Sequence, residues 1–229
     1  MSDNAGGRMP EAAELAVVAR DLAVSGPQGP VYGPVDLDVH AGGVTVLVAA
    51  AGTGRTALLM TLAGRMRQDR GTLSVFGATE PRKIFATAAI AGVDELDTLA
   101  DAVTVRDAVT EQMRWNAPWY RRIRPADTAD LQRICAPVFG ELPLPPLGST
   151  VEELSELDRL LLRIALADTA RPPLLIVGGL DLLTSDRNRE LLLQRLIDLG
   201  GTRTVITATV NGVTAEAVRA QIILDEEGV

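Results

Sequence analysis

The chain has 229 residues, of which 47% are hydrophobic and 3% aromatic, and its net charge at pH 7 is −8. This length suits one large α/β domain with a core of Leu, Val, Ile and Ala, and the acidic balance argues against a general nucleic-acid binder. A single cysteine, Cys135, excludes an internal disulfide framework, and no apolar run approaches the roughly 18 residues of a membrane span.

The first half of the chain predicts a series of strands. Residues 1–14 are polar and rich in Gly and Ala, so we expect them to be disordered and to contain no signal peptide. We expect strands at residues 15–24, 35–39, 44–48, 71–76 and near 88–93. A helix is predicted from Thr56 to about Met66, and a loop is predicted around Pro81, Arg82 and Lys83.

The second half predicts a helical region and then further strands. The sequence TVRDAVTEQMRW (residues 104–115) is typical of a helix with Thr104 as its N-cap, and six prolines interrupt residues 118–146. We therefore expect a separate helical lobe over about residues 96–170. Other helices are predicted at residues 151–168, 187–199 and 215–220, and other strands at 174–177, 204–208 and 222–224.

The stretch AAAGTGRT, residues 49–56, is the strongest candidate for a binding site. It joins a buried strand to a helix, and the backbone N–H groups of such a glycine turn bind phosphate together with the positive end of the helix. The usual pattern is G-x-x-x-x-G-K-[ST]. Ala49 stands at the first glycine, Gly54 at the second, Arg55 at the lysine, and Thr56 at the hydroxyl that contacts a metal ion.

The candidate phosphate-binding residues are therefore Gly52, Thr53, Gly54, Arg55, Thr56 and Ala57, and Thr56 is also the candidate magnesium contact. The alternative is that Gly52, Thr53 and Gly54 only make a tight turn between the strand and the helix.

Five stretches, taken in order, carry a resemblance to a known family. They are residues 20–64 with the glycine-rich loop, GTLSVFG (71–77), IAGVDELDTLADAVTVRDAV (90–109), ELSELDRLLLRIALADTARPPLLIV (153–177) and QIILDEEGV (221–229). Over residues 15–229 the chain resembles the nucleotide-binding domain of ATP-binding-cassette (ABC) transporters. The resemblance implies a single α/β domain of the phosphate-loop NTPase type, with a RecA-like core, an antiparallel β lobe and a helical lobe.

The acidic residues that the family places after the strand at 174–177 are missing. In the family, an Asp at the first position orients magnesium and a Glu at the second polarises the attacking water. Gly178 and Gly179 stand at these positions. Asp181 would serve as the metal-binding Asp only in a shifted alignment, which would place Leu182 at the position of the Glu.

The signature motif of the family, LSGGQ, corresponds to LSELD at residues 154–158. Leu154 and Ser155 are kept, and they are the candidate signature residues. Glu156 and Asp158 add negative charge where the motif would approach an anion, which opposes binding. Alternatively, Ser155 only caps the following helix, with Asp158 in place of the Glu of a capping box.

Three other family positions also depart from the pattern. The glutamine loop has the acidic residues Asp94 and Glu95, and Val210 stands where the switch histidine is expected. The only histidine, His40, is expected to be a surface or strand-end residue. The aromatic residue that stacks on adenine is absent from its place, and Tyr32 is a displaced candidate.

These departures predict a degenerate ABC subunit without catalytic residues, a pseudo-ATPase that serves as a structural or regulatory partner of a membrane protein. We expect ATP and Mg to bind weakly or not at all. The resemblance implies a permease-like membrane protein and a homodimeric or heterodimeric cassette partner, no nucleic acid, and a place on the cytoplasmic face of the membrane. The alternatives are a slow but genuine ATPase, including one half of an asymmetric cassette pair that powers a transporter, and a stand-alone nucleotide sensor.

The segment WNAPWYRR, residues 115–122, gathers Trp115, Trp119 and Tyr120 close to Arg114, Arg121 and Arg122. It fits either the core of the helical lobe or a contact surface for a membrane partner, because Trp, Tyr and Arg dominate protein interfaces. RNA stacking is a third interpretation, which the net charge disfavours.

Overall fold

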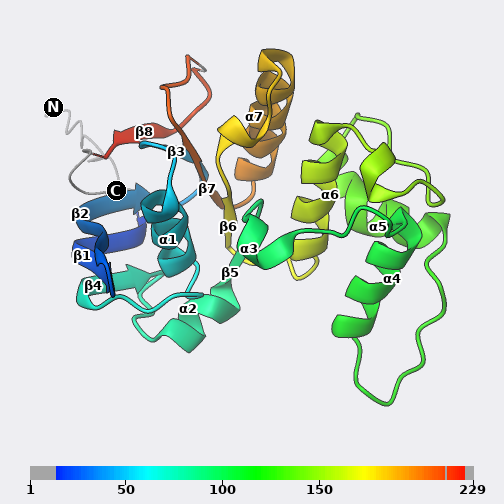
Figure 1. Ribbon diagram of the computed structural model, residues 1–229, viewed down its shortest axis with the longest axis horizontal. Helices are drawn as coiled ribbons and strands as arrows, with labels where there is room; N and C mark the ends of the chain where they lie inside the picture. Colours follow the sequence, from blue (N-terminus) through cyan, green and yellow to red (C-terminus); the bar gives the residue numbers. More distant parts are fainter. Residues whose placement is uncertain (1–13, 215, 225–229) are drawn as a thin grey trace, which may run out of the picture.

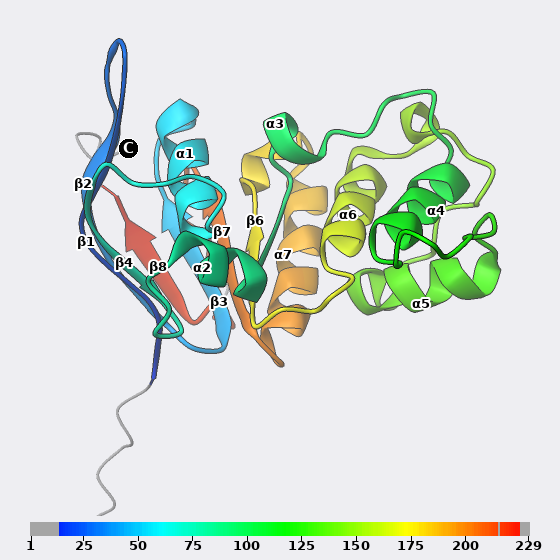
Figure 2. The ribbon, with the colours of Figure 1, turned by 90° about the horizontal axis from the view of Figure 1, so that it is seen from below.

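The computed structural model describes residues 14–214 and 216–224. The disorder expected for residues 1–14 therefore falls almost entirely outside the described residues. Within them, the strands form a three-stranded sheet of order β2-β1-β4 and a five-stranded sheet of order β5-β6-β7-β3-β8. Figures 1 and 2 show the larger sheet between the smaller sheet at one end and the helices α4, α5 and α6 at the other.

The smaller sheet is antiparallel and is formed by β1 (Leu15–Gly26), β2 (Gly29–His40) and β4 (Arg70–Val75). Along β2, Val35, Leu37 and Val39 are buried and the residues between them are exposed, as the two-residue period of a half-buried strand requires. This is the antiparallel β lobe that the resemblance implied. His40 is the exposed last residue of β2, which confirms its predicted place at a strand end.

The larger sheet is parallel throughout. Its strands are β5 (Ala88–Ala91), β6 (Leu174–Val177), β7 (Thr204–Thr209), β3 (Gly43–Val48) and β8 (Ala220–Ile223). Every residue of β5, β6 and β7 is buried, which explains why these strands appear in the sequence as short, mostly apolar runs without alternation. Because the strands are parallel, the loops that follow β3, β6 and β7 meet at one edge of the sheet.

The described helices are α1 (Thr53–Leu62), α2 (Pro81–Thr87), α3 (Asp94–Asp97), α4 (Val105–Trp115), α5 (Thr128–Phe139), α6 (Glu156–Ala167) and α7 (Asp186–Gly200). Two 3₁₀ turns, η1 (Val151–Glu153) and η2 (Leu180–Leu182), accompany them. In the described residues no helix has both the length and the apolar character to cross a membrane. The predicted N-cap of α4 is confirmed, since Thr104 accepts a hydrogen bond from the backbone N–H of Asp107.

Two hydrophobic clusters cover the two faces of the parallel sheet. Leu22 and Leu37 of the antiparallel sheet pack with Leu58 and Leu62 of α1 on one face. Phe139 of α5 and residues of α6 and α7 pack on the other face. The sheet edge that carries the loops after β3, β6 and β7 is therefore held rigidly between two apolar layers.

Four sequence predictions need correction. The helix predicted for residues 151–168 is interrupted, because the Ser155 side chain caps the N–H of Asp158 and α6 starts only at Glu156. Helix α1 begins three residues earlier than predicted, at Thr53, and ends at Leu62. The loop expected around Pro81 is the first turn of α2, where proline fits because no partner for its missing N–H is needed.

The last correction concerns the helix predicted for residues 215–220. Residue 215 lies outside the described residues, and the described residues 216–219 form a turn that leads into β8. The backbone N–H of Arg219 donates to the carbonyl of Val44, so this segment already lies beside β3 before β8 begins.

Candidate functional site

The loop after β3 lies beside the end of β7, at the edge where the parallel strands finish. Val48 is in register with Thr209, and the N–H of Ala49 donates to the carbonyl of Thr209 at 3.0 Å. The turn after β6 joins the same edge, since the hydroxyl of Thr207 donates to the carbonyl of Gly178 at 3.0 Å. In open α/β sheets, ligands bind at this carboxyl edge.

The N-terminus of α1 is open to an incoming group. Its N-cap is Gly52, no side chain among the described residues caps it, and its first turn contains no acidic residue. Gly52 and Thr53 are exposed, a Cβ built on Gly52 would meet nothing within 4 Å, and Thr56 is half-buried one turn into the helix. The backbone N–H groups of the first turn can therefore donate hydrogen bonds to a bound anion.

Ala49 takes the place of a glycine without strain. Among the described residues other than glycine, a positive φ occurs only at Asp21, Phe76 and Arg171. The backbone at Ala49 therefore does not need the conformational freedom that only glycine provides.

Arg55 does not project into solvent, because it forms an ion pair with Asp181. Nη1 of Arg55 lies 2.8 Å from Oδ2 of Asp181 and 3.4 Å from the carbonyl of Ala49 in its own loop. The exposed fractions of the two side chains are 12% and 28%. The cation at the lysine position is thus already neutralised by a carboxylate of the same chain.

Asp181 also binds the end of β7. Its carboxylate accepts hydrogen bonds from the N–H of Val210 at 3.0 and 3.3 Å and from the hydroxyl of Thr209 at 3.3 Å. One side chain therefore joins the loops after β3, β6 and β7. From the sequence, Asp181 was considered only as a metal ligand in a shifted alignment. Its pairing with Arg55 was missed because the two residues are 126 positions apart in the chain.

Gly178 and Gly179 stand where side chains would collide with neighbouring groups. A Cβ on Gly178 would lie 2.0 Å from the carbonyl oxygen of Gly92, which is fixed backbone at the end of β5. A Cβ on Gly179 would lie 2.7 Å from Nη2 of Arg55. The arginine thus fills the space into which a side chain at position 179 would extend.

Ser155 caps α6, as the alternative interpretation proposed. Its hydroxyl oxygen accepts from the N–H of Asp158 at 3.0 Å and donates to the Asp158 carboxylate at 2.8 Å. Leu154 is buried in the hydrophobic core. Both candidate signature residues therefore have structural contacts of their own.

Glu156 is tied to the start of α7. Its carboxylate accepts from the N–H and hydroxyl of Thr184 at 2.9 and 2.7 Å, from the Asn188 amide at 2.8 Å and from the Ser185 N–H at 3.2 Å. These hydrogen bonds, that of the Thr184 N–H above all, lower the pKa of Glu156 to about 2. The sequence treated Glu156 only as a charge that repels an anion, whereas the structure shows a carboxylate whose oxygens are engaged by donors of its own chain.

Asp94, one of the two acidic residues at the glutamine-loop position, pairs with a buried arginine, as does the nearby Asp97. Arg163 of α6, only 9% exposed, forms ion pairs with Asp94 at 2.9 Å and with Asp97. Asp97 also accepts from the N–H groups of Gly92 and Val93. The side chain of Glu95 lies outside the described part of the chain. Arg163 thus connects the helices at one end of the molecule to the turn after β5.

The exposed fractions of the aromatic side chains correct two expectations from the sequence. Tyr32 is 2% exposed and belongs to the core, where burial raises its pKa to about 12, so it cannot stack on a ligand at the surface. Trp115, Trp119 and Tyr120 are 78%, 95% and 73% exposed, so the interpretation of their segment as core is wrong.

Comparison with known proteins places this architecture in a family. A sequence profile described as ABC transporter matches residues 32–177, which is more than half of the chain. A segment of 66 residues is 38% identical to the cytochrome c biogenesis ATP-binding export protein CcmA of Xanthomonas axonopodis pv. citri. This match covers 29% of the chain and 31% of that relative, so the chain spans less than a third of its length.

Solved structures share the fold. The ADP conformation of an ATP-binding cassette of an ABC transporter superimposes with a TM-score of 0.73 at 12% identity, over 93% of this chain and 88% of the other. The protein cbiO1 from Clostridium perfringens, part of the ABC transporter complex cbiONQ, gives a TM-score of 0.68 at 15% identity, over 93% and 86%. The family profile matches more than half of the chain, and the parallel sheet has the phosphate-loop edge of the family. The chain therefore belongs to the ABC transporter family, as one of its ATP-binding cassettes.

Proposed function

We propose that this cassette is a subunit of a membrane transport complex that does not hydrolyse ATP and that contributes structure or regulation. The observation that carries the proposal is the turn after β6, where Gly178 and Gly179 offer no carboxylate and where the backbone of Gly92 leaves no room for a side chain at position 178. Phosphoryl transfer to water requires a group that positions the water and a metal ion that neutralises the developing charge. Losing such a group typically costs about 10² to 10⁴ in rate.

Asp181 does not replace the missing carboxylates. Both of its oxygens accept hydrogen bonds from Arg55, Thr209 and Val210, so it would have to give up these contacts before it could bind magnesium. Releasing Asp181 would also leave Arg55 without its counter-charge. This competition supports weak binding of Mg-ATP, with magnesium held through Thr56 alone.

The phosphate loop still supports residual anion binding. The first-turn N–H groups of α1 lack a side-chain acceptor, and the loop is exposed. A phosphate that reached Arg55 would have to compete with Asp181 at 2.8 Å. We therefore propose that ATP binds weakly, through backbone N–H groups more than through Arg55.

A groove at the helical end suits a membrane partner. It has a volume of about 390 Å³, lies between α3, α4 and α6, and is lined by apolar residues such as Leu99, Val103 and Leu166 together with polar ones such as Gln112. ATP-binding subunits of this family work with membrane permeases, and a permease segment docked in this groove would place the chain on the cytoplasmic face of the membrane. A second cassette, identical or different, would complete the assembly.

The decisive experiment measures Mg-ATP binding and ATP hydrolysis by the purified chain. We expect weak binding in calorimetry and no hydrolysis above background. Asp181→Asn should tighten ATP binding because it frees Arg55, whereas Thr56→Ala should weaken it. Thr128→Ala, an exposed threonine at the start of α5, is the matched control and should have no effect on binding.

Two results would overturn the proposal. Magnesium-dependent hydrolysis by the pure chain that disappears in a Gly54→Ala/Thr56→Ala double variant would show a genuine, if slow, ATPase. Hydrolysis that appears only together with a co-purified second cassette would instead establish an asymmetric pair.

A further inference from the structure

The end of α4 and the loop after it expose three of the four Trp and Tyr side chains of the chain. The chain has two Trp and two Tyr, and Trp115, Trp119 and Tyr120 lie within six residues of one another. Each is at least 73% exposed. Trp119 and Tyr120 pack edge to face, with ring centroids 5.9 Å apart, and so form one apolar projection. Such rings are normally largely buried, so their joint exposure indicates a binding surface.

The same segment carries a local positive charge in an acidic protein. Residues 112–126 contain four arginines and no Asp or Glu, while the whole chain has a net charge of −8. Arg124 is paired with Asp127 and Asp130. Arg114, Arg121 and Arg122 are exposed, and within the described residues they take part in no ion pair. Their charge is therefore available to an external anion.

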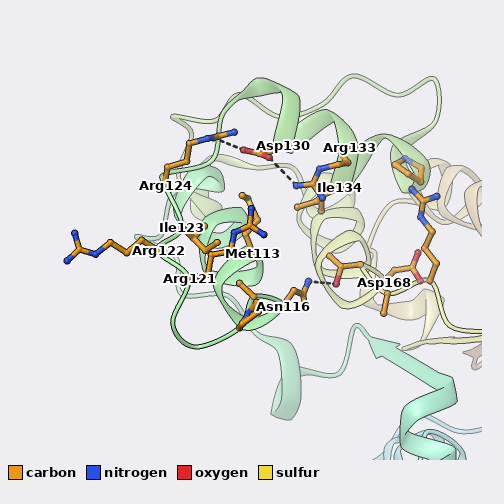
Figure 3. A pocket seen from close by; sticks show the side chains of 16 residues that line it. Met113, Asn116, Arg121, Arg122, Ile123, Arg124, Asp130, Arg133, Ile134 and Asp168 are labelled. Atoms are coloured by element: carbon orange, nitrogen blue, oxygen red, sulfur yellow. Dashed lines mark hydrogen bonds and ion pairs between the residues drawn. The ribbon is translucent and has the colours of Figure 1, made fainter.

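A cavity of about 970 Å³ opens beside these arginines. Its two carboxylates are already neutralised inside the protein, Asp130 by Arg124 and Arg133 and Asp168 by Arg203. Figure 3 shows the Asp130 contacts, and it shows Arg122 pointing away from the cavity into open space. The rim of the cavity therefore presents uncompensated positive charge from Arg121 and Arg122.

We propose that this segment, residues 114–122, binds the surface of an anionic lipid bilayer. Trp and Tyr settle at the level of the lipid headgroups, because one part of each ring system is apolar and another donates hydrogen bonds. Arginines beside them attract anionic headgroups. The inference goes beyond the transporter assignment, because it needs no membrane protein.

The shape and charge of the segment favour a lipid surface over a protein partner. Interface hot spots in proteins lie in packed pockets surrounded by other contacts. Trp119, by contrast, is 95% exposed on a loop that Figure 1 shows projecting beyond the end of α4. The unpaired charges are of one sign, which complements an anionic bilayer over its whole extent rather than one particular partner.

The chain provides its own probe, because both of its tryptophans belong to this segment. The full chain would be mixed with vesicles of phosphatidylcholine alone or with about one third phosphatidylglycerol, at low salt. With the anionic vesicles we expect a blue shift of tryptophan emission and co-sedimentation of the protein, and with the neutral vesicles much less of both. Raising the salt to about 0.5 M should weaken the binding, because the screening length shortens.

Variants separate the contribution of the arginines to membrane binding from that of the aromatic side chains. Arg121→Gln/Arg122→Gln should lower the partition coefficient about 25-fold, at roughly fivefold for each arginine. Arg82→Gln/Arg187→Gln removes two exposed arginines outside the segment and is the matched control, which should bind nearly as the parent does. Trp119→Ala/Tyr120→Ala should reduce co-sedimentation, and Phe85→Ala, an exposed aromatic side chain on α2, should not.

Three outcomes would overturn the proposal: no binding to anionic vesicles at low salt, equal binding to neutral vesicles, or the same loss of binding in the segment variants and in the control variants. If pure vesicles fail while membranes that contain a permease retain the chain through Trp119 and Tyr120, the segment binds a protein instead. Because the vesicles contain no protein, their failure leaves the proposed role in a transport complex unaffected.

Discussion

The ion pair between Arg55 and Asp181 makes a quantitative prediction about the phosphate loop. Its N–O distance is 2.8 Å, and the two side chains are 12% and 28% exposed. At an effective dielectric constant of about 20, the attraction at this distance is about 6 kcal/mol before the costs of desolvation and ordering. Exposed pairs contribute about 0.2 to 1 kcal/mol after these costs, and breaking a buried pair costs about 3 to 5 kcal/mol. For this half-buried pair we expect a coupling free energy of about 2 kcal/mol.

A double-mutant cycle measures this coupling. Arg55→Met keeps much of the side-chain volume without the charge, and Asp181→Asn keeps an acceptor for Thr209 and Val210. The free energy of unfolding in urea would be determined for the parent, both single variants and the double variant. The control cycle uses Lys83→Met and Glu80→Gln, because this pair is about two-thirds exposed on both sides and should show a coupling below about 1 kcal/mol.

A coupling no larger than that of the control pair would refute the reasoning. It would mean that the guanidinium is solvated in solution and free to receive a phosphate. The same variants then offer a second check, since Asp181→Asn would no longer be expected to change ATP affinity.

Three shorter predictions follow from other contacts. Gly178→Ala should lower the melting temperature sharply, as measured by circular dichroism, because the added Cβ would lie 2.0 Å from the Gly92 carbonyl, whereas Gly148→Ala meets nothing within 4 Å. Glu156 has its pKa lowered to about 2, so its contribution to stability is present above pH 4.5 and is lost as the pH falls toward 2. Glu156→Gln should therefore melt lower than the parent at pH 7, and the difference should shrink in acid. The thiol of Cys135 is buried and its pKa is raised to about 12, so alkylating reagents should modify it only as the protein unfolds.

The framework of the fold could be predicted from the sequence because each of its signals is local. The buried strands, the glycine turn before α1 and the Thr104 cap of α4 are all set by residues within a few positions of one another. Helix α5 was harder to predict, because Pro137 lies inside it and the capping box of Asp127 and Asp130 starts it after a proline-rich segment. The break before α6 depended on whether Ser155 bonds to the backbone or faces solvent, which apolar periodicity does not decide.

The contacts that define the site were out of reach of the sequence for a different reason. Arg55 and Asp181 are 126 positions apart, Arg163 and Asp97 are 66 apart, and Glu156 reaches residues 28 to 32 positions away. Charge pairing over such separations leaves no periodic signal. The motif comparison could identify which residues differ from the family, but it could not show that the substituted residues bind one another.

The contact between Arg55 and Asp181 determines what happens when single residues of the site are changed to those of the family motif. Restoring a glutamate at position 179 alone would place its Cβ 2.7 Å from the Arg55 guanidinium, and restoring an aspartate at 178 would collide with the backbone of Gly92. Replacing Arg55 with lysine alone would leave Asp181 with a different partner geometry, since a lysine offers a point charge rather than a planar fork. The residues that replace the family's motif therefore form one connected arrangement, in which Asp181 bridges three loops. On the proposal that the cassette does not hydrolyse ATP, hydrolysis would require changes to Arg55, Asp181 and the β5 turn at Gly92 together, and single reversions should lower stability without creating activity.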